Sequence, residues 1–151
     1  MGFFTERKNR KYIPIILSME LVIFVFLLSY FTLINLRDFG RSAFGLVAIL
    51  AFFFLFLGII LIILTLKQKI KGRLKILLLL TGLSAICPLI FSILHNLFYA
   101  LAVVFQDITL LRYLMEFLHG FSFLISLIGG PIGFLIGIIG SIMLLFKEKK
   151  S

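Results

Sequence analysis

One carboxyl and two imidazoles lie inside the long apolar stretches of this chain. Glu20 lies in the first stretch, eight residues after Tyr12, and it is the only acid well inside one. Eight residues of helix rise about 12 Å, a depth at which an isolated carboxylate is disfavoured by several kcal/mol. Glu20 should therefore be protonated, paired or facing a wet cavity, and it is a candidate proton or cation site. The alternative is a carboxyl that reaches the inner headgroups or bonds to a neighbouring helix, since the residues sharing its face are apolar.

The two histidines belong to polar stripes in later stretches. The third stretch carries small or polar residues at every third or fourth position: Thr81, Ser84, Ala85, Pro88, Ser92, His95, Asn96 and Tyr99. The fourth stretch carries a matching set: His119, Ser122, Ser126, Gly129, Gly130, Gly133, Gly137, Gly140 and Ser141. This spacing places each set on one side of a helix, and in lipid a polar side chain does best against another helix. Antiparallel packing of the two sides would gather a candidate polar cluster: Ser92, His95, Asn96, Tyr99, Glu116, His119 and Ser122.

The chemistry of such a cluster depends on its two histidines. Two histidines and a carboxylate are able to ligate a metal ion, and two histidines on facing helices are able to hold a haem. The sequence lacks an i, i+4 histidine pair and the Glu-x-x-His spacing, which fix ligand geometry in advance. Interhelical hydrogen bonds and contact with headgroup water are the alternative roles. We therefore expect no resident metal or cofactor, and keep haem or metal binding through His95 and His119 as a third hypothesis.

A ridge of glycines in the fourth stretch predicts a close contact between helices. Gly129, Gly133 and Gly137 form two overlapping small-xxx-small steps, and Gly140 continues the ridge. The contact is either with a second copy of the chain or with a helix of the same subunit, most simply the third. Pro131 lies within the ridge and removes one backbone donor, which predicts a kink there.

The overall composition excludes water as the main solvent of this chain. Of its 151 residues, 62% are hydrophobic and 14% charged, with a mean hydropathy of +1.24, whereas soluble domains are about half apolar and a quarter charged. The net charge of +9 would suggest nucleic acid in a soluble protein. Here the basic residues abut apolar stretches, where they meet anionic lipid headgroups, so we expect no nucleic-acid partner. The single cysteine, Cys87, cannot form an intramolecular disulfide.

Four apolar stretches must position these residues, at 13–36, 44–66, 76–105 and 117–146. The 24 residues of the first extend about 36 Å as a helix, against a hydrocarbon core of about 30 Å. Short connections make successive helices antiparallel neighbours, which predicts an all-α membrane protein in which residues 1–151 form one up-down four-helix transmembrane domain. Residues 106–116 mix polar and apolar side chains, and they form a possible short helix in the outer headgroup region.

The distribution of Lys and Arg predicts the orientation. Twelve basic residues flank one set of span ends: Arg7, Lys8, Arg10, Lys11, Lys67, Lys69, Lys71, Arg73, Lys75, Lys147, Lys149 and Lys150. Three flank the other set: Arg37, Arg41 and Arg112. The positive-inside rule then places both termini in the cytoplasm, and we expect a multi-pass protein of the cell membrane.

Three functional hypotheses follow. The first is a non-enzymatic protein of packing or assembly, acting as an accessory subunit of a partner membrane protein or as a homo-oligomer. It rests on the two small-residue faces and on the lack of a polar pathway. The lack of a Ser-His-Asp set, a phosphate-binding loop or paired carboxylates argues against an enzyme. The second is a dimeric proton- or cation-coupled transporter of small molecules that uses Glu20. The third is the haem or metal hypothesis above.

Overall fold

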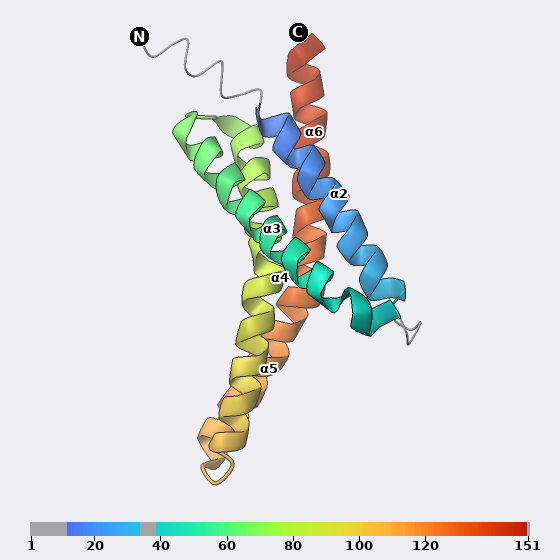
Figure 1. Cartoon of the computed structure of the whole chain (residues 1–151). Helices are drawn as coiled ribbons and strands as arrows, with labels where there is room; N and C mark the ends of the chain where they lie inside the picture. The colour runs from blue at the N-terminus through green and yellow to red at the C-terminus, as the bar shows by residue number, and fades with distance from the viewer. Residues whose placement is uncertain (1–11, 34–38, 151) are drawn as a thin grey trace.

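The computed structural model describes the backbone of residues 12–33 and 39–150, and the side chains of residues 12–30 and 45–147. Its helices are α2 (Tyr12–Leu33), α3 (Phe39–Lys67), α4 (Gly72–Val104), α5 (Thr109–Leu124), the π-helical turn η1 (Ile125–Gly129) and α6 (Gly130–Lys150). Segments α5, η1 and α6 follow one another without a break and form the fourth long helix. The four long helices pack antiparallel (Figure 1), which confirms the predicted up-down four-helix bundle.

Each of the four long helices is long and apolar enough to cross a membrane. Helix α2 begins one residue before the first predicted span, and α3 begins five residues before the second and ends one residue after it, while residues 34–38, where the first was expected to end, lie outside the described part. The third was expected to end near residue 105, and Phe105 is the C-cap of α4. Of the predicted basic flanks, residues 7, 8, 10, 11 and 37 lie outside the described residues, as do the side chains of residues 41, 149 and 150.

The fourth helix differs from its expectation at its beginning. We expected a span from residue 117 and a separate short helix within 106–116, but α5 already begins at Thr109 and continues into the span. A turn closed by the hydrogen bond from Ile108 N to Phe105 O joins it to α4. The polar residues of 109–116 therefore lie on the first turns of a long helix that packs antiparallel to α4.

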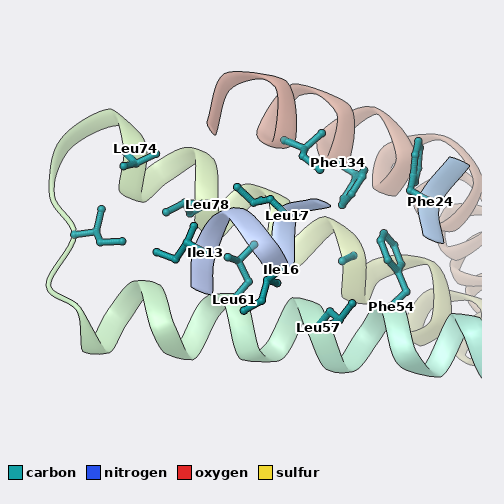
Figure 2. Packing of buried hydrophobic residues seen from close by; sticks show 13 residues of the cluster. Ile13, Ile16, Leu17, Phe24, Phe54, Leu57, Leu61, Leu74, Leu78 and Phe134 are labelled. Carbon is teal, nitrogen blue, oxygen red and sulfur yellow. The ribbon is translucent and has the colours of Figure 1, made fainter. Parts of the chain in front are cut away.

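The hydrophobic core lies where α2 meets α3, α4 and α6. Phe24, Phe54 and Phe134 come from three of these helices, and the ring of Phe134 lies 4.6 Å from that of Phe24 and 5.0 Å from that of Phe54. Toward the end that carries the α3–α4 turn, Leu17, Leu61 and Leu78 fill the space between the helices (Figure 2). Side chains this large and this fully buried fix how the four helices rotate relative to one another.

The glycine ridge packs against α4 of the same subunit. A Cβ atom on Gly137 would lie 2.7 Å from the backbone nitrogen of Thr81, and one on Gly133 would lie 2.5 Å from the Ser84 hydroxyl. Only glycine lets the two backbones approach so closely at these points. The remaining covered ridge glycine, Gly140, packs on Leu77. Because this face is covered, it is not open to a second copy of the chain.

Gly129 is the member of the ridge that does not face α4. A Cβ there would meet only Ile125, one turn earlier in its own helix. Gly129 ends the π-helical turn η1, which lies just before Pro131. This π-helical turn shifts Gly129 out of register with Gly133 and Gly137.

Helix α4 and the fourth helix reach farther than their neighbours. Phe24 stacks on Phe134, and Gly133, the residue before Phe134, packs on Ser84. All four residues therefore lie at about the same depth in the bundle. After Phe24, α2 has nine residues left, whereas α4 has twenty left after Ser84. At 1.5 Å per residue, α4 continues about 16 Å past Leu33, the last residue of α2 that the structure describes. Together with α5 it forms a protruding pair of helices (Figure 1), and we refer to residues 92–124 as the hairpin.

Candidate functional site

The two histidines lie in contact across the α4–α5 seam. Their rings stack with centroids 3.9 Å apart and planes inclined by 21°. His95 Nδ1 lies 3.1 Å from the backbone oxygen of His119, and His119 Nδ1 lies 3.0 Å from the backbone oxygen of His95. Because a carbonyl oxygen only accepts, each Nδ1 carries a proton and donates it to the other residue's backbone. The pair is a reciprocal clamp between the two helices of the hairpin.

Two further rings enclose this pair. Tyr99 lies with its ring centroid 5.4 Å from that of His119, and Phe123 lies 5.3 Å from His95. One turn deeper in the seam, Ser122 is buried. Ser126 then donates a hydrogen bond of 2.9 Å to the backbone oxygen of Pro88. The α4–α5 seam is therefore polar from the histidines toward the middle of the bundle, and hydrogen bonds from His95, His119 and Ser126 cross it.

The arrangement of the histidines does not fit a shared metal ion or haem. A ligating nitrogen binds along its lone pair in the plane of its own ring, so two ligands of one ion need ring planes that converge on it. Here the two rings stack with centroids 3.9 Å apart and planes inclined by only 21°, so the planes do not converge within ligand distance of both rings. A haem between them would need imidazoles on opposite faces of the porphyrin, where the rings now touch each other. Among the described residues, no three His, Cys, Asp or Glu side chains form a group that would hold a metal.

The other members of the predicted cluster lie at the surface of the hairpin. Asn96 is exposed and donates a hydrogen bond of 2.8 Å to the backbone oxygen of Ser92, within its own helix. Glu116 pairs at 2.8 Å with Arg112, with both side chains about half exposed. The structure therefore brings His95, Tyr99 and His119 together but leaves Ser92, Asn96 and Glu116 facing outward.

Arg112 was considered only as a topology signal, although it binds Glu116. The i, i+4 spacing of the two residues was the signal that could have revealed this pair, because residues four apart are neighbours on a helix.

Glu20 is sealed inside the bundle. Its side chain is 0% exposed, so it does not reach the headgroups. It lies one turn from Phe24 and one turn from Leu17, both core residues. Within the described part of the chain, neither carboxyl oxygen has a hydrogen-bond partner, and the buried Ser141 hydroxyl on α6 has none either. An isolated carboxylate in such surroundings is strongly disfavoured, which favours the neutral acid.

No family model, curated protein or solved structure matches this chain. The composition, the helices and the packing therefore carry the functional argument, and together they describe a four-helix polytopic membrane protein.

Proposed function

We propose that this protein acts without chemistry of its own and works by assembly, as an accessory subunit of another membrane protein or as a homo-oligomer. Three groups capable of chemistry are closed off. Glu20 is fully buried among core side chains, and His95 and His119 use each other as partners. Glu20 is closed to solvent, and the Nδ1 atoms of both histidines are used in hydrogen bonds within the hairpin, which supports a role in binding a partner.

The observation that carries this proposal is the exposed polar side of the hairpin. Ser92, Asn96, Arg112 and Glu116 are all exposed, on helices whose other exposed side chains are mostly apolar. Polar groups on a membrane helix are stabilised by another helix or by water at the membrane surface. Because the glycine ridge is already used inside the subunit, this polar side is the surface that we assign to partner binding.

The proposal includes the orientation of the protein. The start of α2, the α3–α4 turn and the end of α6 lie at one end of the bundle (Figure 1). Lys67, Lys69, Lys71, Arg73 and Lys75 cluster at that turn, which supports a cytoplasmic location for this end and contact with anionic headgroups. The hairpin would then emerge on the outer side of the cell membrane.

The test compares two neighbouring exposed residues of α4. Asn96→Ala removes a polar group from the side assigned to partner binding, whereas Leu97→Ala shortens an apolar side chain about 100° away around the helix. Homo-association is measured by energy transfer between labelled copies in vesicles, and hetero-association by the stoichiometry of the complex extracted from the native membrane. We expect one defined complex that Asn96→Ala weakens and Leu97→Ala preserves. A protein that is monomeric in vesicles and lacks a stoichiometric partner in its membrane would refute the proposal.

A second candidate function, proton-coupled transport, is favoured by one observation. Glu20 has no hydrogen-bond partner within the described residues. A buried carboxyl without a partner lowers the stability of the fold, and ionisable residues inside membrane helices are commonly functional. If Glu20 carries protons, proteoliposomes should show a pH-driven flux that Glu20→Gln abolishes. A flux that is unchanged in Glu20→Gln, or its absence in both proteins, would exclude this role.

A further inference from the structure

The hairpin has two different sides, which follow from the contact between its histidines. His95 and His119 touch across the seam and mark one edge of it. On the same side as this edge, α4 continues with Ser92, Asn96 and Tyr99, and α5 continues with Arg112 and Glu116, because positions three, four and seven apart share a helix face. Antiparallel helices carry these flanks on the same side of the pair. We call this side the polar side of the hairpin.

The opposite side of the hairpin, its back side, is apolar on both helices. Its members are exposed aliphatic or aromatic residues spaced by three, four or seven: Ile93, Leu97, Val104, Leu110, Leu114 and Phe117. Leu110 is the most open of them, with 80% of its surface exposed. An apolar surface of this extent is unfavourable in water and indicates a binding partner.

The length of α4 limits where this surface can lie. Its 33 residues extend about 50 Å, well beyond the roughly 30 Å hydrocarbon core and beyond the 40 to 45 Å of a whole bilayer. A membrane helix that is too long accommodates the mismatch by tilting. Tilting toward the back side would bring Leu110 and Leu114 onto the bilayer while the polar side turns to water.

We infer that the back side of the hairpin rests on the lipids of the leaflet from which the hairpin emerges. Three observations favour lipid as the occupant. The back side continues the exposed apolar surface of the membrane spans without a polar break. The ion pair between Arg112 and Glu116 lies on the polar side, and its two charges offset each other within α5. Tyr113, in the first turns of α5, is exposed, as tyrosines at membrane interfaces are.

Because the chain contains no tryptophan, a single introduced tryptophan reports its own surroundings. Leu114→Trp places the reporter on the back side, and Tyr99→Trp places it on the polar side. Each position is five residues from the helix end at the α4–α5 turn, so the two lie at matching depth. Val22→Trp, on the exposed surface of α2, provides the reference for a residue in lipid. The variants are reconstituted into vesicles of phosphatidylcholine with and without brominated acyl chains, and iodide is added to the water.

We expect the Leu114→Trp variant to emit at shorter wavelength and to lose most of its fluorescence to brominated lipid, as the Val22→Trp variant does. The Tyr99→Trp variant should instead be quenched by iodide. Quenching of both hairpin reporters by iodide would overturn the inference, because the hairpin would then stand free in water. Quenching of both by brominated lipid would also overturn it, since the hairpin would be immersed on all sides. Protection of the Leu114→Trp reporter from both quenchers would overturn it in favour of a covering protein, either a second copy or another partner.

Discussion

His95 and His119 hold each other by two hydrogen bonds that run in opposite directions across the α4–α5 seam. Each ring donates from Nδ1 to the other residue's backbone oxygen, at 3.1 and 3.0 Å, while the two rings stack. Since the acceptors are backbone atoms, either hydrogen bond survives loss of the other residue's side chain. The clamp is therefore two nearly independent hydrogen bonds joined by one ring contact.

His119→Phe should remove one hydrogen bond of this clamp and keep a stacked ring. We expect a loss of about 0.6 to 1 kcal/mol in the free energy of unfolding, as for single hydrogen bonds between membrane helices. His95→Phe should cost about the same because the geometry is reciprocal. Unfolding in mixed micelles of increasing denaturing-detergent content, followed by circular dichroism, measures the change. Tyr99→Phe is the control and should leave stability unchanged. Equal losses in all three variants would contradict the two hydrogen bonds between His95 and His119.

Gly137→Ala should destabilise the bundle much more than Gly120→Ala. A Cβ at residue 137 would lie 2.7 Å from the backbone nitrogen and 3.0 Å from the Cα of Thr81, so two helix backbones must move apart. Overpacking of this kind costs about 1 to 3 kcal/mol. A Cβ at Gly120 meets nothing within 4 Å, and alanine there should be neutral or stabilising by up to about 1 kcal/mol. The same unfolding measurement applies, and a neutral Gly137→Ala would show that the close contact with α4 is absent.

Gly133→Ala provides an intermediate case. The atom nearest to its added Cβ would be the Ser84 hydroxyl, which is the end of a side chain that can rotate away. We expect a smaller loss than for Gly137→Ala, while leucine at either position should prevent folding. Comparing the yield of folded monomer in detergent for the four variants tests this order.

Glu20→Leu should stabilise the protein by about 1 to 3 kcal/mol. The carboxyl is fully buried and has no hydrogen-bond partner in the described structure, so removing it relieves a desolvation cost. Glu20→Gln, which keeps a buried polar group of the same size, serves as the control and should leave stability nearly unchanged. Thermal unfolding in detergent distinguishes the two variants. A destabilised Glu20→Leu protein would contradict this expectation, because it would mean that the Glu20 carboxyl has a stabilising partner.

Phe134→Ala should be among the most damaging single changes in the core. Its ring is 0% exposed and contacts both Phe24 and Phe54, and truncation of such a side chain costs about 3 to 5 kcal/mol. Ile136→Ala, two residues further along α6 on an exposed face, is the matched control and should be nearly neutral. Similar losses in the two variants would show that α6 is rotated relative to the arrangement described.

Several features followed from the sequence alone. Four apolar stretches separated by charge predicted four antiparallel helices, because hydrocarbon offers no partner to an unpaired backbone group. The polar stripes of the third and fourth spans placed His95 and His119 on facing sides, and antiparallel order placed them at the same depth. The small residues of the fourth span predicted a close helix contact. In each case the helical period and the chain order carried the information.

Other features were decided only by the packing of the whole bundle. Asn96 and Thr81 belong to one polar stripe of the sequence, but Asn96 is exposed on the hairpin whereas Thr81 is buried against Gly137 of α6. The sequence left two partners open for the glycine ridge, a second copy of the chain or a helix of the same subunit, most simply the third, and the packing selects α4 of the same subunit. Gly129 leaves the ridge through a π-helical turn. Glu20 became a core residue because α2 turns that side inward. Apart from a few polar residues such as Glu20, α2 and α3 are apolar on all sides, so the fit of large side chains such as Phe24, Phe54 and Phe134 sets their rotation.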